Sequence, residues 1–365
     1  MQEILRVLIA PDSFKGSAGN QEVANAIARG WEKVRPQDTI SKLPMADGGE
    51  ETLETFATRF PTAKRFTARV NFYEKETREA TWLLLDDGTA IVELAEACGL
   101  THMKTLDPLK ASTFAFGELL KSAAANPDVK KIIACLGGSA STDGGVGALM
   151  ALGARFYKAS GDAIELGGQG LLELHSLDLS KITKSPESGV VSLFDVSNFL
   201  LGEDGAARVY GPQKGATEEE IKILEYGLKQ LVKVTAQIDF SGAGSAGGTS
   251  FGMNFGWGST LASGSQTVGE ILGLREEISA ADIVITGEGR FDNQSAQGKV
   301  VGLIQEISKE HEKRLLLCVG SSALDFSSHH LSGEILEEIA GSAEKAISEP
   351  LKWLEQAGEL LALKV

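Results

Sequence analysis

Residues 132–147, with the sequence I-I-A-C-L-G-G-S-A-S-T-D-G-G-V-G, constrain the fold more than any other stretch of the chain. An apolar run long enough for one buried strand ends at Gly137-Gly138, and an Ala/Leu/Met stretch typical of a helix follows Gly145. The pattern predicts a strand, a glycine loop and a helix, as in α/β proteins. Glycines let backbone N–H groups approach an anion closely, and a helix N-terminus adds partial positive charge. The loop therefore suits a phosphate group, and a loop whose glycines only form a tight turn is the alternative.

Asp143 lies inside this glycine loop and changes its interpretation. A carboxylate beside a phosphate is repulsive unless a divalent cation or a transferable proton lies between them. A site for phosphoryl transfer needs both parts, a phosphate-binding loop and carboxylates that hold a metal. We therefore expect Asp143 to contact a divalent cation, directly or through water.

Two further loops follow strands near the start of the chain. Residues 4–10 form an apolar strand that ends at P-D-S-F-K-G-S, and residues 39–43 form a second strand that ends at P-M-A-D-G-G-E. Ligands of open α/β sheets bind at the carboxyl ends of the strands, so the two loops predict one site between them. A solvated surface position for Lys15, and a turn or helix-capping position for Asp47, are the alternatives.

The domain organisation follows from a change near Arg65, where alternating strand and helix patterns give way to a β-hairpin pattern. Two β-like runs at residues 80–85 and 89–94 are joined by D-D-G, a hairpin signal. The alternation of strand and helix returns at residues 282–286. We therefore predict a doubly wound α/β domain into which a second α/β domain with a mixed sheet is inserted. The predicted bounds are 1–65 and 255–365 for the first domain and 66–254 for the insert.

The charge and the cysteines limit the classes of partner. The formal net charge of -15 argues against nucleic acid and against an anionic membrane, since either partner needs a basic face. The three cysteines have no metal-ligand spacing, so we expect reduced, buried thiols, which fit a cytoplasmic protein. Residues 1–10 lack the long apolar core of a signal peptide, and the uncharged residues 240–269 are too rich in Gly, Ser and Thr for a membrane span.

A second glycine-rich segment, G-A-G-S-A-G at residues 242–247, matches the dinucleotide-binding pattern G-x-G-x-x-G. It follows a helix-like stretch and lacks the strand that this pattern requires. The favoured interpretation is a segment where backbones or a ligand pack closely. The alternative is a hydroxy-acid dehydrogenase that uses NAD.

Taken together, six loops resemble the signature loops of the bacterial glycerate kinase family. They occur in the family's order and span almost the whole chain: P-D-S-F-K-G-S, P-M-A-D-G-G-E, G-G-S-A-S-T-D-G-G, D-V-S-N-x-L-L-G, G-P-Q-K-G-A and G-E-G-R-F-D-N-Q-S-x-x-G-K. The resemblance implies Mg²⁺- and ATP-dependent phosphorylation of D-glycerate, usually at the 2-hydroxyl, to give 2-phosphoglycerate. It implies a flavodoxin-like domain with an inserted restriction-endonuclease-like domain and a substrate cleft between them. A homodimer is left open.

The resemblance and the chemistry of phosphoryl transfer together assign roles to the matching residues. Catalysis is assigned to Asp195, Asp292 and Lys15. Glycerate binding is assigned to Ser13, Lys15, Asp47 and Arg290. The ATP phosphates are assigned to Gly137, Gly138, Ser139, Lys214 and Lys299, and the metal to Asp143 and Asp47.

Asp195 is the predicted general base, because it ends the apolar strand 189–194 and no phosphate-binding loop adjoins it. A turn capped by Asp195 through Asn198 is the alternative. Arg290 is the predicted partner of the glycerate carboxylate, since a planar guanidinium can bind it through two hydrogen bonds.

The chain departs from the family pattern at a few positions. Thr142 stands where the family usually has Asn, Phe194 and Phe199 replace residues of a Cys-Asp-Val-x-Asn-Pro pattern, and Glu51 replaces a glycine. These departures leave a second hypothesis open, a homologue that binds a hydroxy acid but is inactive or has a different specificity.

Overall fold

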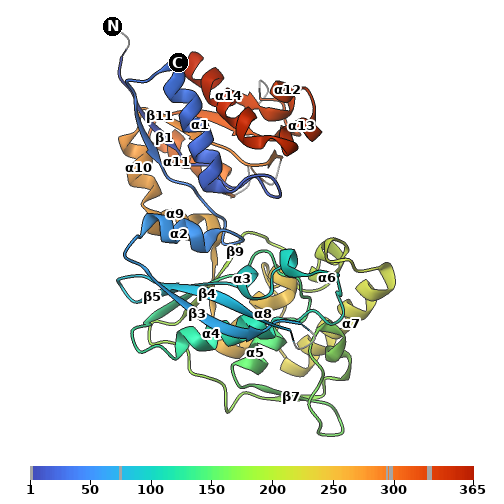
Figure 1. The fold of residues 1–365 in the computed structure, drawn as a ribbon. Helices are drawn as coiled ribbons and strands as arrows, with labels where there is room; N and C mark the ends of the chain where they lie inside the picture. The colour runs from blue at the N-terminus through green and yellow to red at the C-terminus, as the bar shows by residue number, and fades with distance from the viewer. Residues whose placement is uncertain (1–2, 74–75, 293–294, 296–298, 327–330) are drawn as a thin grey trace. The chain divides into compact units, whose positions relative to one another are not determined.

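The computed structural model describes residues 3–73, 76–292, 295, 299–326 and 331–365. Contacts divide the chain into two units, which are coloured by sequence in Figure 1. The first unit comprises Met1–Asp47, Glu54–Arg59 and Ser265–Val365, and the second comprises Gly48–Leu53 and Phe60–Gly264. The second unit thus interrupts the first in sequence. Part of the signature loop at 287–299, including Gly298, lies outside the described residues.

The two contact-based units differ from the predicted domain bounds at both ends of the insert. Residues 255–264 were predicted in the first domain, but strand β10 (Thr260–Ser263) pairs in parallel with β9 (Val190–Phe194) of the second unit. Strand β3 (Lys64–Asn71) begins before the predicted bound at residue 65 and pairs along its whole length with β4 (Thr77–Leu84). Strand pairing therefore places both segments in the second unit.

The first unit contains a five-stranded sheet in which every neighbouring pair is parallel. Its strand order is β15-β13-β11-β1-β2. The predicted strands at 4–10 and 282–286 therefore lie in one sheet, because β1 pairs with β11. The strands are β1 (Arg6–Ile9), β2 (Thr39–Lys42), β11 (Ile283–Thr286), β13 (Arg314–Val319) and β15 (Gly333–Ile335), and a separate short pair is β12 (Arg290–Phe291) with β14 (Ser321–Ser322).

Two helices far apart in sequence, α1 (Asn20–Val34) and α14 (Pro350–Leu363), lie side by side on this unit (Figure 1). They approach closely because glycines face each other across the contact: a Cβ added at Gly30 would lie 1.8 Å from the carbonyl oxygen of Glu355. Trp31 is fully buried beneath them and its indole N–H donates to Asp38 at 3.0 Å. The other helices are α2 (Thr52–Arg59), α9 (Gly264–Leu272), α10 (Leu274–Ala280), α11 (Val300–Glu310), α12 (Leu336–Ala340) and α13 (Ala343–Ser348).

The second unit contains a six-stranded mixed sheet in the order β10-β9-β6-β5-β4-β3. The predicted hairpin is present, since β4 pairs antiparallel with both β3 and β5 (Thr89–Glu93), whereas β5, β6 (Lys131–Cys135), β9 and β10 are parallel. A short hairpin of β7 (Arg155–Tyr157) and β8 (Ser176–Asp178) was not predicted. The α-helices are α3 (Leu94–Cys98), α4 (Phe114–Ala124), α5 (Val146–Ala151), α6 (Ala206–Tyr210), α7 (Glu218–Thr235) and α8 (Ser245–Trp257), and 3₁₀ turns are Leu100–His102, Gly168–Glu173 and Pro212–Lys214.

The second glycine-rich segment packs against the first and does not open a dinucleotide-binding unit. A Cβ added at Gly247 would lie 2.1 Å from the carbonyl oxygen of Ser141, and one at Gly252 would lie 2.3 Å from that of Gly144. The segment enters α8 through left-handed residues and follows a helix and loop, not a strand. Close backbone packing is therefore the reason for these glycines.

The described part of the chain contains three free, buried cysteines. Within it, no helix is both long enough and apolar enough to cross a bilayer.

Candidate active site

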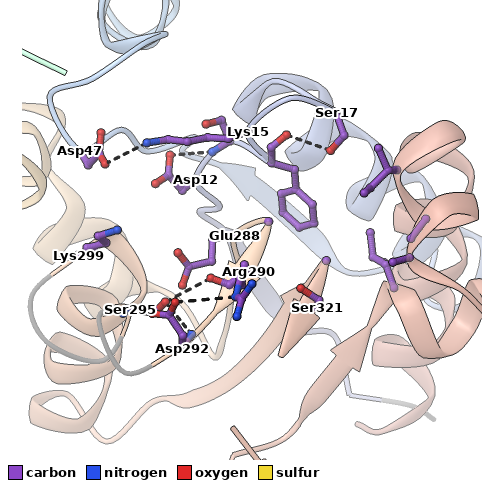
Figure 2. Close-up of a pocket in the computed structure, with 18 residues that line it drawn as sticks. Asp12, Lys15, Ser17, Asp47, Glu288, Arg290, Asp292, Ser295, Lys299 and Ser321 are labelled. Atoms are coloured by element: carbon purple, nitrogen blue, oxygen red, sulfur yellow. Dashed lines mark hydrogen bonds and ion pairs between the residues drawn. The ribbon is translucent and has the colours of Figure 1, made fainter. Parts of the chain in front are cut away.

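Polar side chains from neighbouring strands meet at the carboxyl edge of the first unit's sheet. Asp12 follows β1, Asp47 follows β2, Glu288 follows β11, and Ser321 follows β13. Their side chains line a cavity of about 410 Å³ (Figure 2). The structure brings six of the predicted site residues to this cavity: Ser13, Lys15, Asp47, Arg290, Asp292 and Lys299.

Two cations of the cavity, Lys15 and Arg290, form long ion pairs. Lys15 Nζ lies 3.8 Å from an Asp47 oxygen, and Arg290 Nε lies 4.0 Å from an Asp292 oxygen. The side chains of Lys15 and Arg290 are 67% and 73% exposed. Exposed pairs of this kind contribute at most about 1 kcal/mol, so an anionic ligand can compete for both cations. The prediction had grouped Lys299 with Lys214 at the ATP phosphates, but Lys299 lines this cavity in the first unit and Lys214 lies in the second.

The backbone around the cavity fixes where these side chains can reach. Arg290 stands opposite Ser321 in the register of the β12-β14 pair. Asp12 N donates to the carbonyl oxygen of Gly287 at 2.9 Å, which ties the ends of β1 and β11 together. A Cβ at position 287 would lie 1.6 Å from the carbonyl oxygen of Cys318, so only glycine fits there.

Two carboxyl groups of the cavity, Asp12 and Glu288, were missing from the predicted site. Burial, followed by the charge of Asp47, raises the pKa of Asp12 well above its ordinary value. Burial also raises the pKa of Glu288, against a hydrogen bond from Ser295 and the charge of Lys299. Perturbed carboxyls in a cavity are typical of functional sites. Both residues directly follow apolar strands in loops that were predicted to form the site, and this position could have identified them from the sequence.

Asp143, which was predicted to be a metal ligand, lies buried in the second unit. The side chain is 1% exposed. Its carboxylate accepts hydrogen bonds from Ser112 Oγ, from the Thr113 N–H and hydroxyl, and from the N–H groups of Gly145 and Gly147, at 2.8–3.2 Å. These donors reach both carboxylate oxygens, so Asp143 holds the glycine loop and helices α4 and α5 together. Its role at a metal stays a prediction.

The predicted phosphate loop itself is partly closed by its own side chains. Ser139 Oγ lies 3.0 Å from Ser141 Oγ and accepts from Ser141 N, and Ser139 is 6% exposed. Gly138 is exposed and has a φ of 75°, which favours glycine. A Cβ added at Gly138 would lie 2.9 Å from Cγ of Glu50, so an acidic side chain lies against the loop. Gly137 N donates to Gly48 O at 3.2 Å.

The side chain of Lys214 contacts the backbone of the glycine loop. It ends the 3₁₀ turn Pro212–Lys214, is 3% exposed, and donates from Nζ to the carbonyl oxygen of Ser141. Burial lowers the pKa of Lys214 to about 8, although the charge of Asp143 acts in the opposite direction. Lys214 therefore supports the backbone of the loop that was predicted to bind phosphate.

Asp195 lies at the end of β9, as the apolar strand predicts, and is partly buried. Its Oδ1 accepts from Gly264 N at 2.8 Å and from Ser263 Oγ at 3.2 Å. Asn198 bonds instead to Asp204 O and to the Tyr210 hydroxyl. Asp195 thus fixes the segment after β10, a contact that the sequence did not indicate.

Comparison with known proteins gives a single answer. A sequence profile of the Glycerate kinase family matches residues 7–364. Glycerate 2-kinase of Escherichia coli (strain K12) is 37% identical over 339 residues, which cover 90% of this chain and 88% of the relative. Glycerate kinase of Halalkalibacterium halodurans is 38% identical, with coverages of 86% and 85%.

A solved structure agrees with these relatives. The crystal structure of a candidate glycerate kinase 2 from Salmonella typhimurium LT2 is 33% identical, with a TM-score of 0.81, and the match covers 99% of this chain and 98% of that one. Similarity of this extent reaches both units and every signature loop. The chain belongs to the glycerate kinase family.

Proposed function

We propose that this protein transfers the γ-phosphoryl group of ATP to a hydroxyl of D-glycerate and releases 2-phosphoglycerate and ADP. Family membership supports the reaction, and the relative named glycerate 2-kinase supports the position of transfer. The observation that carries the proposal for this chain is the cavity of the first unit, where Lys15, Arg290 and Lys299 meet at the carboxyl edge of a parallel sheet. A small anionic hydroxy acid fits such a cluster of cations.

The residues divide into two groups of roles. In the first unit, Arg290 and Lys15 bind the glycerate carboxylate, since both side chains are exposed and line the cavity. In the second unit, the backbone at Gly137 and Gly138, of which Gly138 is exposed, receives the phosphates of ATP. Lys214 acts there by holding the loop through Ser141. The prediction that glycerate lies between the two domains stays a prediction.

Mg²⁺ fits this reaction, and Asp47 is the residue of the predicted pair that can hold it. Among the described residues, no group of three or more His, Cys, Asp or Glu side chains is arranged as a metal site. Mg²⁺ in kinases is commonly held by one or two carboxylates together with the phosphates of the nucleotide, and when bound it neutralises the charge of those phosphates. Asp47 lines the cavity and supplies a carboxylate oxygen, the type of ligand that Mg²⁺ prefers.

The finer description of the fold belongs to the same proposal. When the strands of the five-stranded sheet are numbered 1 to 5 along the chain, their order in the sheet is 2-1-3-4-5, which is the order of flavodoxin-like domains. We propose a flavodoxin-like first unit and, for the mixed sheet of the second, a restriction-endonuclease-like fold.

A coupled assay tests the function and the cation assignment together. ADP formation should require both D-glycerate and Mg²⁺, and identification of the product should give 2-phosphoglycerate. Arg290→Lys should raise the glycerate KM by about 10-fold or more with a smaller effect on the ATP KM, because Lys keeps the charge but loses the planar fork. Arg275→Lys, at an exposed pair with Glu310, is the matched control. A raised ATP KM with an unchanged glycerate KM would reverse the assignment.

A further inference from the structure

Glu288 occupies a central place in the cavity. It follows β11, the middle strand of the five-stranded sheet, and stands between two glycines. Figure 2 shows its side chain among Asp12, Ser295 and Lys299, all of which line the cavity. No role has been assigned to it so far.

The protein satisfies the Glu288 carboxyl group only in part. The Ser295 hydroxyl donates one hydrogen bond to it. Its Oε1 atom is buried and has no hydrogen-bond partner among the described residues. A buried oxygen without a partner costs on the order of 1–3 kcal/mol, so such atoms are rare and call for an explanation. A proton acceptor that works during a reaction explains why this group is retained.

The charges that face Glu288 make it a better base than a hydrated glutamate. Burial and the charges of Asp292 and Asp47 raise its pKa, whereas Ser295 and Lys299 lower it. A carboxylate destabilised by burial accepts a proton more readily.

The other carboxyls of the cavity suit this task less well. Asp47 and Asp292 already pair with Lys15 and Arg290, the two cations that are proposed to bind glycerate. Asp12 is the remaining candidate, and burial followed by the charge of Asp47 raises its pKa well above the ordinary value. Its Oδ1 already accepts a hydrogen bond from Ser13 N at 2.7 Å, whereas Oε1 of Glu288 has no partner among the described residues.

We propose that Glu288 is a catalytic residue that accepts the proton of the attacking hydroxyl; the proposal rests on the glycerate kinase function above. The hydroxyl oxygen forms a bond to the γ-phosphorus as its proton moves to the Glu288 carboxylate. The bond between that phosphorus and the β,γ-bridging oxygen breaks, and ADP leaves with the electron pair. Glu288 then releases the proton to solvent, so the reaction yields phosphoglycerate, ADP and one proton.

The test is Glu288→Gln in the coupled assay, because glutamine keeps the shape of the side chain and cannot accept the proton. We expect kcat to fall by about 10² or more, with the glycerate KM and the half-saturating Mg²⁺ concentration within about threefold of wild type. The acid limb of the wild-type profile of kcat against pH should flatten in the variant. Thermal unfolding of the variant checks that it is folded.

Three further variants make the result specific. Glu32→Gln, at an exposed glutamate of α1, should leave kcat unchanged. Asp12→Asn should retain more activity than Glu288→Gln, since the carbonyl oxygen of asparagine can still accept the hydrogen bond from Ser13 N. Asp195→Asn tests the base predicted from sequence, and its kcat should fall less than that of Glu288→Gln, because Oδ1 of Asp195 already accepts hydrogen bonds from residues 263 and 264.

The possible failures are distinguishable. A wild-type protein without glycerate-dependent ADP formation contradicts the proposed function. If wild type is active, a near-normal kcat in Glu288→Gln overturns the inference, and so does a loss confined to glycerate KM or to Mg²⁺ affinity. A loss of kcat in Asp195→Asn or Asp12→Asn that exceeds the loss in Glu288→Gln moves the role to that residue.

Discussion

Glu93 gives the second unit a stability that should fall steeply with pH. It ends β5, is 5% exposed, and its Oε2 accepts from Leu53 N at 2.9 Å. Burial raises the pKa of Glu93 to about 8, from an ordinary value of 4.5. The carboxyl therefore keeps its proton in the folded chain over a range of pH in which the unfolded chain has lost it.

The size of the effect follows from the two pKa values. Between pH 4.5 and pH 8 the folded state binds one more proton than the unfolded state, so the free energy of unfolding falls as pH rises. The slope is about 1.4 kcal/mol per pH unit. Relative to its value at low pH, the free energy of unfolding is lower by about 3 kcal/mol at pH 7 and by about 5 kcal/mol above pH 8.

Glu93→Gln should remove this loss, since glutamine is neutral at every pH and its carbonyl oxygen can still accept from Leu53 N. Urea unfolding of both proteins from pH 4.5 to 9 gives the difference between their free energies of unfolding. We expect the variant to become more stable relative to wild type as pH rises, and the difference to become constant above pH 8. Glu79→Gln, at an exposed residue of the neighbouring strand β4, should show no such trend. Parallel curves for wild type and Glu93→Gln would refute the buried, protonated carboxyl.

Two further predictions concern the glycine loop. In urea unfolding, Gly247→Ala should destabilise the protein by about 2 kcal/mol more than Gly161→Ala. Both glycines have positive φ, but only a Cβ at position 247 would clash with the carbonyl oxygen of Ser141. Equal losses of stability in the two variants would contradict this clash. Asp143→Asn should cost about 3 kcal/mol or more, because its amide group would face N–H donors, while the Mg²⁺ requirement of the folded variant stays unchanged. A raised Mg²⁺ requirement would restore the metal assignment.

Much of the fold could be predicted from local patterns. Apolar runs that end in glycine or polar residues identified β1, β2, β6, β9, β11 and β13 close to their observed bounds. Strand β10, with the sequence T-L-A-S, was missed because it is short, only partly buried, and lies in a stretch rich in Gly and Ser. Its position depends on pairing with β9, a distant segment, and no local pattern records such pairing.

The candidate site was predictable where charge marks a strand end. Lys15, Asp47 and Arg290 could be placed near one another because parallel strands end at a common edge. Asp143 could not be interpreted in the same way. Its main partners, Ser112 and Thr113, lie about thirty residues earlier, so the sequence shows a carboxylate among glycines but not the donors that saturate it.

Asp143, Lys214 and Gly247 each make a different contact with the glycine loop, and together these contacts fix the shape of its backbone. Asp143 binds the loop's N–H groups, Lys214 binds the carbonyl oxygen of Ser141, and Gly247 gives that carbonyl room. Because Gly145 and Gly147 donate to Asp143, the proposed contacts with phosphate fall to other N–H groups of the loop. Those groups belong to a backbone that the protein already holds in place, which lowers the entropy cost of binding. A residue that signals phosphate binding in a sequence, such as Lys214, can therefore act indirectly, by shaping the backbone that is proposed to touch the ligand.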